Sequence, residues 1–136
     1  MKNAIAVFSR FSLFTIFFWF GLLKVIGASP ASALVKLLER ELLPFIPFSQ
    51  FIIFFGIFEM AIGVLFLLPR LRLVAMSLFG LHMICTFLPL FILPDFTWQK
   101  IFVPTLEGQY ILKNLVLVAL ALSITVNERS RSPFGL

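Results

Sequence analysis

The sequence predicts an all-α membrane protein, a bundle of four transmembrane helices with a short amphipathic helix between the first and the second. Its composition points to a membrane, because 61% of the 136 residues are hydrophobic and 12% are charged, far from the averages of soluble domains. Four apolar runs each approach the roughly 20 residues that a helix needs to cross the hydrocarbon core. At this length we expect a single domain covering residues 1–136.

The first apolar run, residues 5–26, contains Arg10 near its start and Lys24 near its end. Together with the A-x-A pattern at residues 31–33, it also resembles a secretory signal peptide with its cleavage site. Lys24 interrupts the run, however, and the run is longer than the roughly 7–15 apolar residues of such peptides. We therefore interpret it as the first span, with cleavage as the alternative.

A short amphipathic helix is predicted over residues 31–43, on the membrane surface or over the mouth of the bundle. Its apolar positions recur with the helical period: Ala31, Leu34, Val35, Leu38 and Leu42. Its opposite side is polar: Ser32, Lys36, Glu39 and Arg40. Pro44 and Pro47 follow, and proline ends a helix because it lacks the amide hydrogen and clashes with the preceding turn.

The remaining spans are predicted at residues 48–69, 73–93 and 109–126. The second and third spans are joined by residues 70–72 alone, a link so short that the two helices must be antiparallel neighbours. Pro89 is expected to kink the third span. The loop after it carries Trp98 and Phe102, which suit the membrane interface. Residues 127–136 form a polar tail.

The distribution of lysine and arginine predicts that both termini are cytoplasmic, because cytoplasmic segments carry an excess of these residues. One side of the membrane holds Lys2, Arg10, Arg70, Arg72, Arg129 and Arg131. The other side holds Lys36, Arg40 and Lys100. The net charge of +5 is spread over the ends of the apolar runs. Because it forms no basic stripe, nucleic acid is not an expected partner.

Glu59 lies near the middle of the second span, where an isolated carboxylate costs several kcal/mol unless it faces protein, water or a partner charge. Gly56 and Gly63 share its helix face, which lets neighbouring helices approach closely. His82 lies at the same depth on the third span. Both side chains are about 17 Å below the outer boundary at about 1.5 Å per residue. Glu59 and His82 are therefore candidate partners.

Lys24 and Lys113 lie shallower, about 4–7 Å below the outer boundary by the same arithmetic. Because ionisable groups in a bilayer gather where they share partners and water, we expect both lysines to line one outward-opening cavity with Glu59 and His82. Tyr110 lies on the helix face of Lys113. An aromatic and aliphatic cavity with a few convergent polar groups suits a hydrophobic small molecule such as a quinone.

Each candidate residue also has a structural interpretation. Glu59 is then a carboxyl that is either paired with a lysine or protonated and hydrogen-bonded. The lysines extend to the interface, and His82 is a core histidine hydrogen-bonded to a helix carbonyl or to Thr86. With one cysteine, Cys85, the chain forms no intramolecular disulfide. A haem held by two histidines would need a second histidine. No residues have the spacing of metal ligands, so no metal site is expected.

Four segments resemble the DoxX-like family of small bacterial membrane proteins: FGLLKVIGASPA (20–31), FEMAIGVLFLLPR (58–70), HMICTFLPLFILPDFTW (82–98) and PTLEGQYILKNLVLVALAL (104–122). The resemblance implies a four-helix bundle in the bacterial cytoplasmic (inner) membrane. Some relatives are linked to thiosulfate:quinone oxidoreduction or to redox-stress defence. The resemblance places recurring polar positions of the family at Lys24, Glu59, His82, Glu107, Gly108 and Lys113. We expect Glu107 and Gly108 to support the loop that precedes the fourth span.

These observations favour an accessory subunit of a membrane redox system that binds a quinone-like molecule and meets a membrane or periplasmic redox partner. The alternative is a small proton-coupled transporter or carrier that uses Glu59 with Lys24 and Lys113. A third hypothesis is an enzyme in its own right, which is less favoured because the chain carries no redox centre of its own. The sequence leaves the oligomeric state open.

Overall fold

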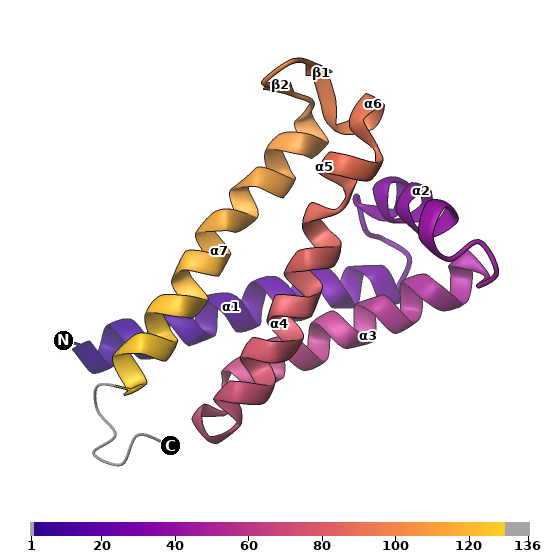
Figure 1. Ribbon diagram of the computed structural model, residues 1–136. Helices are drawn as coiled ribbons and strands as arrows, with labels where there is room; N and C mark the ends of the chain where they lie inside the picture. The colour runs from indigo at the N-terminus through magenta and orange to yellow at the C-terminus, as the bar shows by residue number, and fades with distance from the viewer. Residues whose placement is uncertain (1, 130–136) are drawn as a thin grey trace.

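The computed structural model describes residues 2–129 (Figure 1). Four long helices make up most of it: α1 (Lys2–Val25), α3 (Phe48–Phe66), α4 (Arg72–Phe87) and α7 (Leu106–Arg129). Four helical segments are long and apolar enough to cross a membrane: Asn3–Val25, Phe48–Phe66, Pro69–Ile92 and Leu106–Asn127. The protein is therefore an all-α, multi-pass membrane protein, and this prediction is confirmed.

The ends of the spans differ from their predicted positions. Helix α3 ends at Phe66, before the predicted 69, and the short helix η1 (Pro69–Leu71) makes the tight connection to α4. The third span is interrupted at Pro89, where a kink was predicted: α4 ends at Phe87 and a separate turn, α5 (Pro89–Ile92), follows. Helix α7 extends beyond the predicted 109–126 at both ends. The part of the predicted tail from residue 130 onward lies outside the described residues.

Helix α2 (Ser32–Leu42) occupies the predicted amphipathic segment and contacts both α3 and α5. One residue was assigned to the wrong side. Glu39 was expected on the polar face with Lys36 and Arg40, which are exposed, but its side chain is buried, with 4% of its surface accessible. The reason is that α2 lies against both α3 and α5. The side of α2 that faces protein is therefore broader than its apolar stripe, and it includes Glu39.

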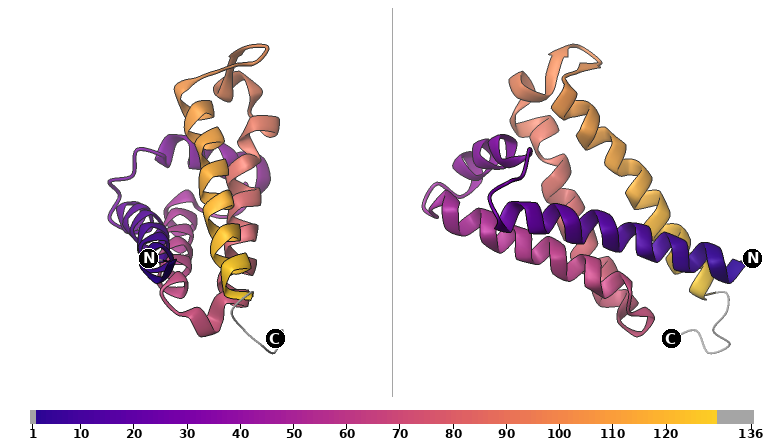
Figure 2. Two further views of the ribbon diagram at one scale, coloured as in Figure 1. Left: turned by 90° about the vertical axis from the view of Figure 1, so that its left-hand side faces the viewer. Right: turned by 180° about the vertical axis from the view of Figure 1, so that it is seen from behind.

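The four spans form two pairs. Helices α1 and α3 touch along their length, and α4 and α7 lie side by side as the second pair (Figure 2). Helix α4 also contacts α3, as the tight link between them predicts. The two pairs converge at the end of the molecule that bears both termini, and they diverge at the opposite end, where α2 and α5 lie between them (Figures 1 and 2). We call the first the terminal end and the second the open end.

Glycine permits the close approach of α1 and α3. A Cβ added to Gly21 would lie 2.4 Å from the carbonyl oxygen of Gly56, and one added to Gly56 would lie 2.6 Å from the carbonyl oxygen of Gly21. Real Cβ atoms do not approach a backbone atom so closely, so side chains at these positions would separate the helices. The sequence prediction that Gly56 allows close helix packing is confirmed.

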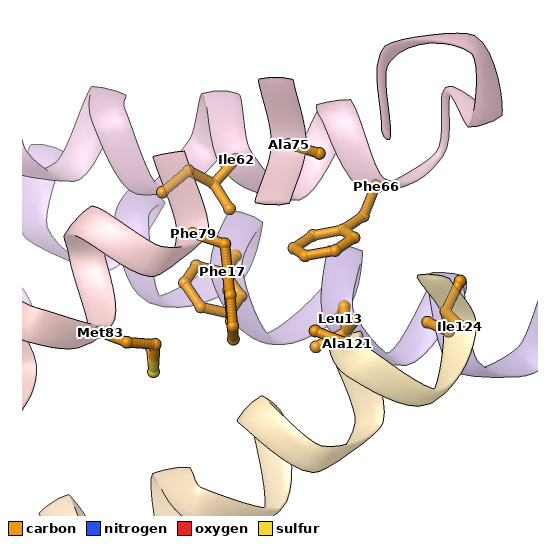
Figure 3. Packing of buried hydrophobic residues seen from close by; sticks show 9 residues of the cluster. All are labelled: Leu13, Phe17, Ile62, Phe66, Ala75, Phe79, Met83, Ala121 and Ile124. Carbon is orange, nitrogen blue, oxygen red and sulfur yellow. The ribbon is translucent and has the colours of Figure 1, made fainter. Parts of the chain in front are cut away.

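The apolar core lies where the two pairs converge (Figure 3). All four spans contribute to it: Leu13, Phe17, Ile62, Phe66, Ala75, Phe79, Met83, Ala121 and Ile124. The ring of Phe79 meets those of Phe17 and Phe66 edge-on, each at a centroid distance of 5.5 Å. These edge-to-face contacts are the preferred geometry of aromatic pairs, and they fix α4 against α1 and α3.

Arg10 joins α1 to α3 at the terminal end. Its guanidinium donates a hydrogen bond to the carbonyl oxygen of Phe66, and its side chain is buried. Phe66 is the last residue of α3, and the final carbonyls of a helix have no partner within the helix. A cation is also favoured there by the helix dipole. Arg10 was interpreted from the sequence as a topology signal, and the structure adds this capping contact.

The connection between α5 and α7 is more ordered than the predicted loop. It contains the short helix α6 (Pro94–Thr97) and an antiparallel hairpin of β1 (Trp98–Lys100) and β2 (Val103–Pro104). Thr97 is fully buried, and its hydroxyl donates to the carbonyl oxygen of Leu93 at 3.0 Å. These strands were not predicted, because segments this short display no alternating pattern.

Candidate functional site

Glu59 of α3 lies between Lys24 of α1 and His82 of α4. The Lys24 ammonium donates to Oε2 of Glu59 at 2.6 Å, and Nε2 of His82 is 2.7 Å from Oε1. Each of the three residues is only 5% exposed. The prediction that Glu59 lies within reach of a lysine or of His82 is confirmed, and the structure shows both contacts. With Thr86, which touches His82, these residues form what we call the polar cluster.

The close packing of α1 and α3 brings Lys24 to Glu59. Gly21 precedes Lys24 by about one helical turn, and it touches the backbone of α3 at Gly56, about one turn before Glu59. The lysine therefore crosses only a short gap and points along the bundle interior instead of outward. Burying either charge alone would be costly, and the mutual contact offsets that cost. The alternative in which Lys24 extends to the interface is wrong.

Aromatic rings enclose the polar cluster. The imidazole of His82 stacks on Phe55 at a centroid distance of 5.1 Å and an interplanar angle of 10°. Phe17 meets the same imidazole edge-on at 5.2 Å, and the Lys24 ammonium lies 5.7 Å from the Phe55 centroid. Such an apolar wall strengthens the electrostatic contacts inside it. Phe55 was missed, although its position one turn before Glu59 was a usable signal.

The two nitrogens of His82 face different partners. An ionised carboxylate only accepts hydrogen bonds, so opposite an ionised Glu59 the hydrogen between the two groups is carried by Nε2. Nδ1 lies 3.2 Å from the hydroxyl oxygen of Thr86, which is also 2.9 Å from the carbonyl oxygen of His82. The hydroxyl can donate to a bare Nδ1, or it can donate to the carbonyl and accept from a protonated Nδ1. Both the neutral and the charged ring are therefore fully hydrogen-bonded.

Tyr110 and Lys113 lie outside the polar cluster. Lys113 is exposed, Tyr110 is 59% exposed, and the Lys113 ammonium is 5.0 Å from the centroid of the Tyr110 ring. The prediction that Lys113 lines one outward-opening cavity together with Lys24, Glu59 and His82 is therefore wrong. The spacing of residues fixes which face of α7 they share, but the rotation of α7 in the bundle turns that face outward. The alternative of an interfacial lysine describes Lys113.

Glu107 and Gly108 lie in the first turn of α7. Gly108 is buried against the preceding loop, where an added Cβ would lie 2.2 Å from the carbonyl oxygen of Thr97. Its amide donates to the hydroxyl of Thr105 at 3.1 Å. Glu107 is half-buried, and a carboxylate in the first turn is favoured by the helix dipole. The contacts of Gly108 are those expected of a residue that supports the loop.

Two hollows in the molecule involve other residues. One, of about 10 Å³, lies at the terminal end and is lined by Arg10, Phe66, Arg72, Ala75, Met76, Ile124 and Thr125. The second is open, measures about 340 Å³ and is lined by Pro94, Trp98, Lys100, Ile101 and Phe102. Neither hollow contains a member of the polar cluster. Within the described part of the chain, no group of three or more histidine, cysteine, aspartate or glutamate residues is placed to hold a metal ion.

No protein-family profile, curated protein or solved structure matches this chain. The resemblance to the DoxX-like family and the redox association that it implies therefore stay predictions. What the chain does has to follow from the chemistry of the polar cluster.

Proposed function

We propose that this chain is an accessory subunit of a membrane redox system, in which the polar cluster gives a proton to, or takes one from, a quinone-like molecule. The hydrogen bonding of His82 carries this proposal. Histidine is the side chain that changes charge most readily near neutral pH, and His82 keeps both ring nitrogens paired in either state. A purely structural ion pair would need only Lys24 and Glu59.

The surroundings of His82 favour a hydrophobic partner molecule. The ring lies among phenylalanines within a membrane-spanning bundle, so a substrate dissolved in the bilayer meets it more readily than one dissolved in water. A quinone takes up protons together with electrons when it is reduced. In this scheme a redox partner in the membrane or periplasm supplies the electrons, Glu59 orients the imidazole, and His82 transfers the proton at Nδ1.

The second candidate is a small proton-coupled transporter or carrier built on the same residues. It was expected to use Lys113 as well as Lys24, but Lys113 is exposed beside Tyr110. A carrier would therefore rest on Lys24, Glu59 and His82 alone. In a carrier, Glu59 would need a free oxygen to bind and release its cargo. Both oxygens are already in contact with protein, one with Lys24 and the other with His82, so we favour the accessory redox role.

We further propose that the protein lies in the bacterial cytoplasmic membrane with both termini in the cytoplasm. The excess of lysine and arginine at the terminal end supports this orientation. Reporter fusions after residues 45, 71, 100 and 130 are expected to read outside, inside, outside and inside. A cytoplasmic signal at 45 or 100 would refute the orientation.

The protonation of His82 can be followed without interference, because it is the single histidine of the chain. We expect the spectrum of the protein labelled with nitrogen-15 histidine, in lipid nanodiscs, to show a hydrogen on Nε2, because Glu59 accepts it. A bare Nε2 would contradict this assignment.

A short-chain quinone added to the same sample separates the two candidate functions. The redox role predicts that the quinone shifts the Nδ1 signal, and that Thr86→Val, which removes the hydroxyl beside Nδ1, changes that shift. Ser123→Ala is the matched control, because Ser123 bonds the backbone of its own helix on an exposed face. Signals that the quinone leaves unchanged would favour the carrier.

A further inference from the structure

The hairpin between α6 and α7 ends in an apolar tip. Strands β1 and β2 pair antiparallel, and Ile101 and Phe102 form the turn between them. These two side chains are 88% and 90% exposed, and Val103 beside them is 46% exposed. Lys100 adjoins the tip on the other side. The polar cluster and the proposed redox role use none of these residues, and the sequence alone predicts that Phe102 suits the membrane interface.

Hydrogen bonds at the base of the hairpin fix the position of the tip. Phe102 has a φ of 59°, a left-handed conformation that is unusual for a bulky side chain. Below it, the indole nitrogen of Trp98 donates to the carbonyl oxygen of Leu90 at 3.0 Å, and the amide of Thr105 donates to Thr97 at 2.9 Å. The chain thus adopts an unfavourable backbone angle in a fixed hairpin, and the result is an aromatic ring directed away from the protein.

Beside the tip lies the open hollow of about 340 Å³. Its walls are the rings of Pro94, Trp98 and Phe102 and the side chain of Ile101, and Lys100 supplies a cation at the same site. An apolar surface next to a lysine amine is the chemistry that meets a phospholipid at the boundary between acyl chains and headgroups.

The position of the hairpin along the bundle matches that boundary. The last membrane-spanning segment covers 22 residues from Leu106, or about 33 Å at about 1.5 Å per residue. The hydrocarbon core is about 30 Å thick, so the hairpin lies at the headgroup layer. Leu106, which begins that segment, is itself 61% exposed. The apolar tip therefore adjoins a lipid-facing helix.

We propose that the Ile101–Phe102 tip inserts into the leaflet at the open end of the bundle, with Lys100 at the level of the lipid phosphates. The occupant of the hollow is then phospholipid of the surrounding bilayer. This contact anchors the open end of the α4–α7 pair, because interfacial aromatic and basic residues set the tilt of a transmembrane helix. A water-exposed tip that receives another protein is the rival outcome.

A tryptophan reporter at the tip tests the insertion. The chain has two tryptophans; Trp19→Phe removes one, Trp98 stays because its indole braces the hairpin, and Phe102→Trp adds the reporter. Subtracting the emission of the Trp19→Phe variant leaves the emission of the tip indole. In phosphatidylcholine vesicles we expect its emission to be blue-shifted, and to be quenched more by lipids brominated near the headgroup than by lipids brominated near the chain end. Emission typical of water, without quenching by either lipid, would overturn the proposal and favour the protein partner.

Two controls keep the result interpretable. The Trp98→Phe variant retains Trp19, which is 59% exposed on the membrane-spanning α1, and its quenching verifies the assay. Phe102→Asn removes the ring but suits the left-handed backbone, so unfolding in detergent should not become easier. In vesicles, hydrogen exchange of residues 98–104 should become faster in this variant. Exchange that remains equal to that of the parent would also overturn the insertion.

Discussion

The Glu59→Leu variant is expected to lose about 3–5 kcal/mol of unfolding free energy, because it leaves the buried Lys24 ammonium without its counter-charge. It also removes the acceptor for Nε2 of His82. Glu59→Gln should lose less, since its amide oxygen still accepts from Lys24 and its NH2 group can donate to Nε2 of His82 when the ring hydrogen moves to Nδ1. Thermal or denaturant unfolding in detergent measures the difference. If both variants unfold like the parent, Glu59 does not hold the cluster together.

A double variant provides the matched control. Lys24→Met with Glu59→Leu removes both charges and replaces them by apolar side chains of similar size. Exchanging a buried ion pair for well-packed apolar residues is often neutral or stabilising, so the double variant should be more stable than Glu59→Leu alone. A double variant as unstable as the single one would place the loss in packing and not in the uncompensated charge.

Gly21→Ala is expected to be the most damaging single-methyl change at the contact between α1 and α3, with a loss of about 3 kcal/mol, the upper end of the usual range for overpacking. Its Cβ would lie 2.4 Å from the carbonyl oxygen of Gly56 and 2.9 Å from the amide nitrogen of Met60. Both are backbone atoms of α3, so relief requires the two helices to separate. That movement would also stretch the contact between Lys24 and Glu59.

Gly80→Ala is the comparison for this change. Gly80 also lies within a spanning helix, but an added Cβ there would have no atom within 4 Å other than those of its chain neighbours and of the backbone of its own helix. Alanine should be neutral or stabilise α4 by up to about 1 kcal/mol, because glycine is the weaker helix former. Unfolding of both variants in the same detergent decides the matter. Similar stability for the two would mean that α1 and α3 adjust without cost.

Much of the fold could be predicted because it depends on hydropathy and proline. The apolar runs marked all four spans, and Pro89 marked the break in the third. Glu59 and His82 could be paired in advance, because two antiparallel helices joined by a tight link have a known relative depth. The ends of α3 and α7 were less predictable, since hydropathy changes gradually at the interface.

The directions of side chains could not be predicted as well. A helical period tells which residues share a face, but not whether that face meets protein or lipid. Lys113 was therefore expected inside and is exposed, whereas Glu39 was expected outside and is buried. Whether each of these faces meets protein or lipid is determined by the packing of whole helices, which involves residues far apart in the chain. The stacking of Phe55 on His82 likewise depends on contact between α3 and α4.

The two polar ties between α1 and α3 have a mechanical consequence. Arg10 holds the last turn of α3 at the terminal end, and Lys24 holds Glu59 toward the open end. Two attachment points oppose sliding or rotation of these helices past one another, so α1 and α3 act as one rigid unit. The bond from His82 to Glu59 joins that unit to α4. A swing of α4 away from α3 must stretch this bond, and any change that weakens the bond must favour the swing to the same extent.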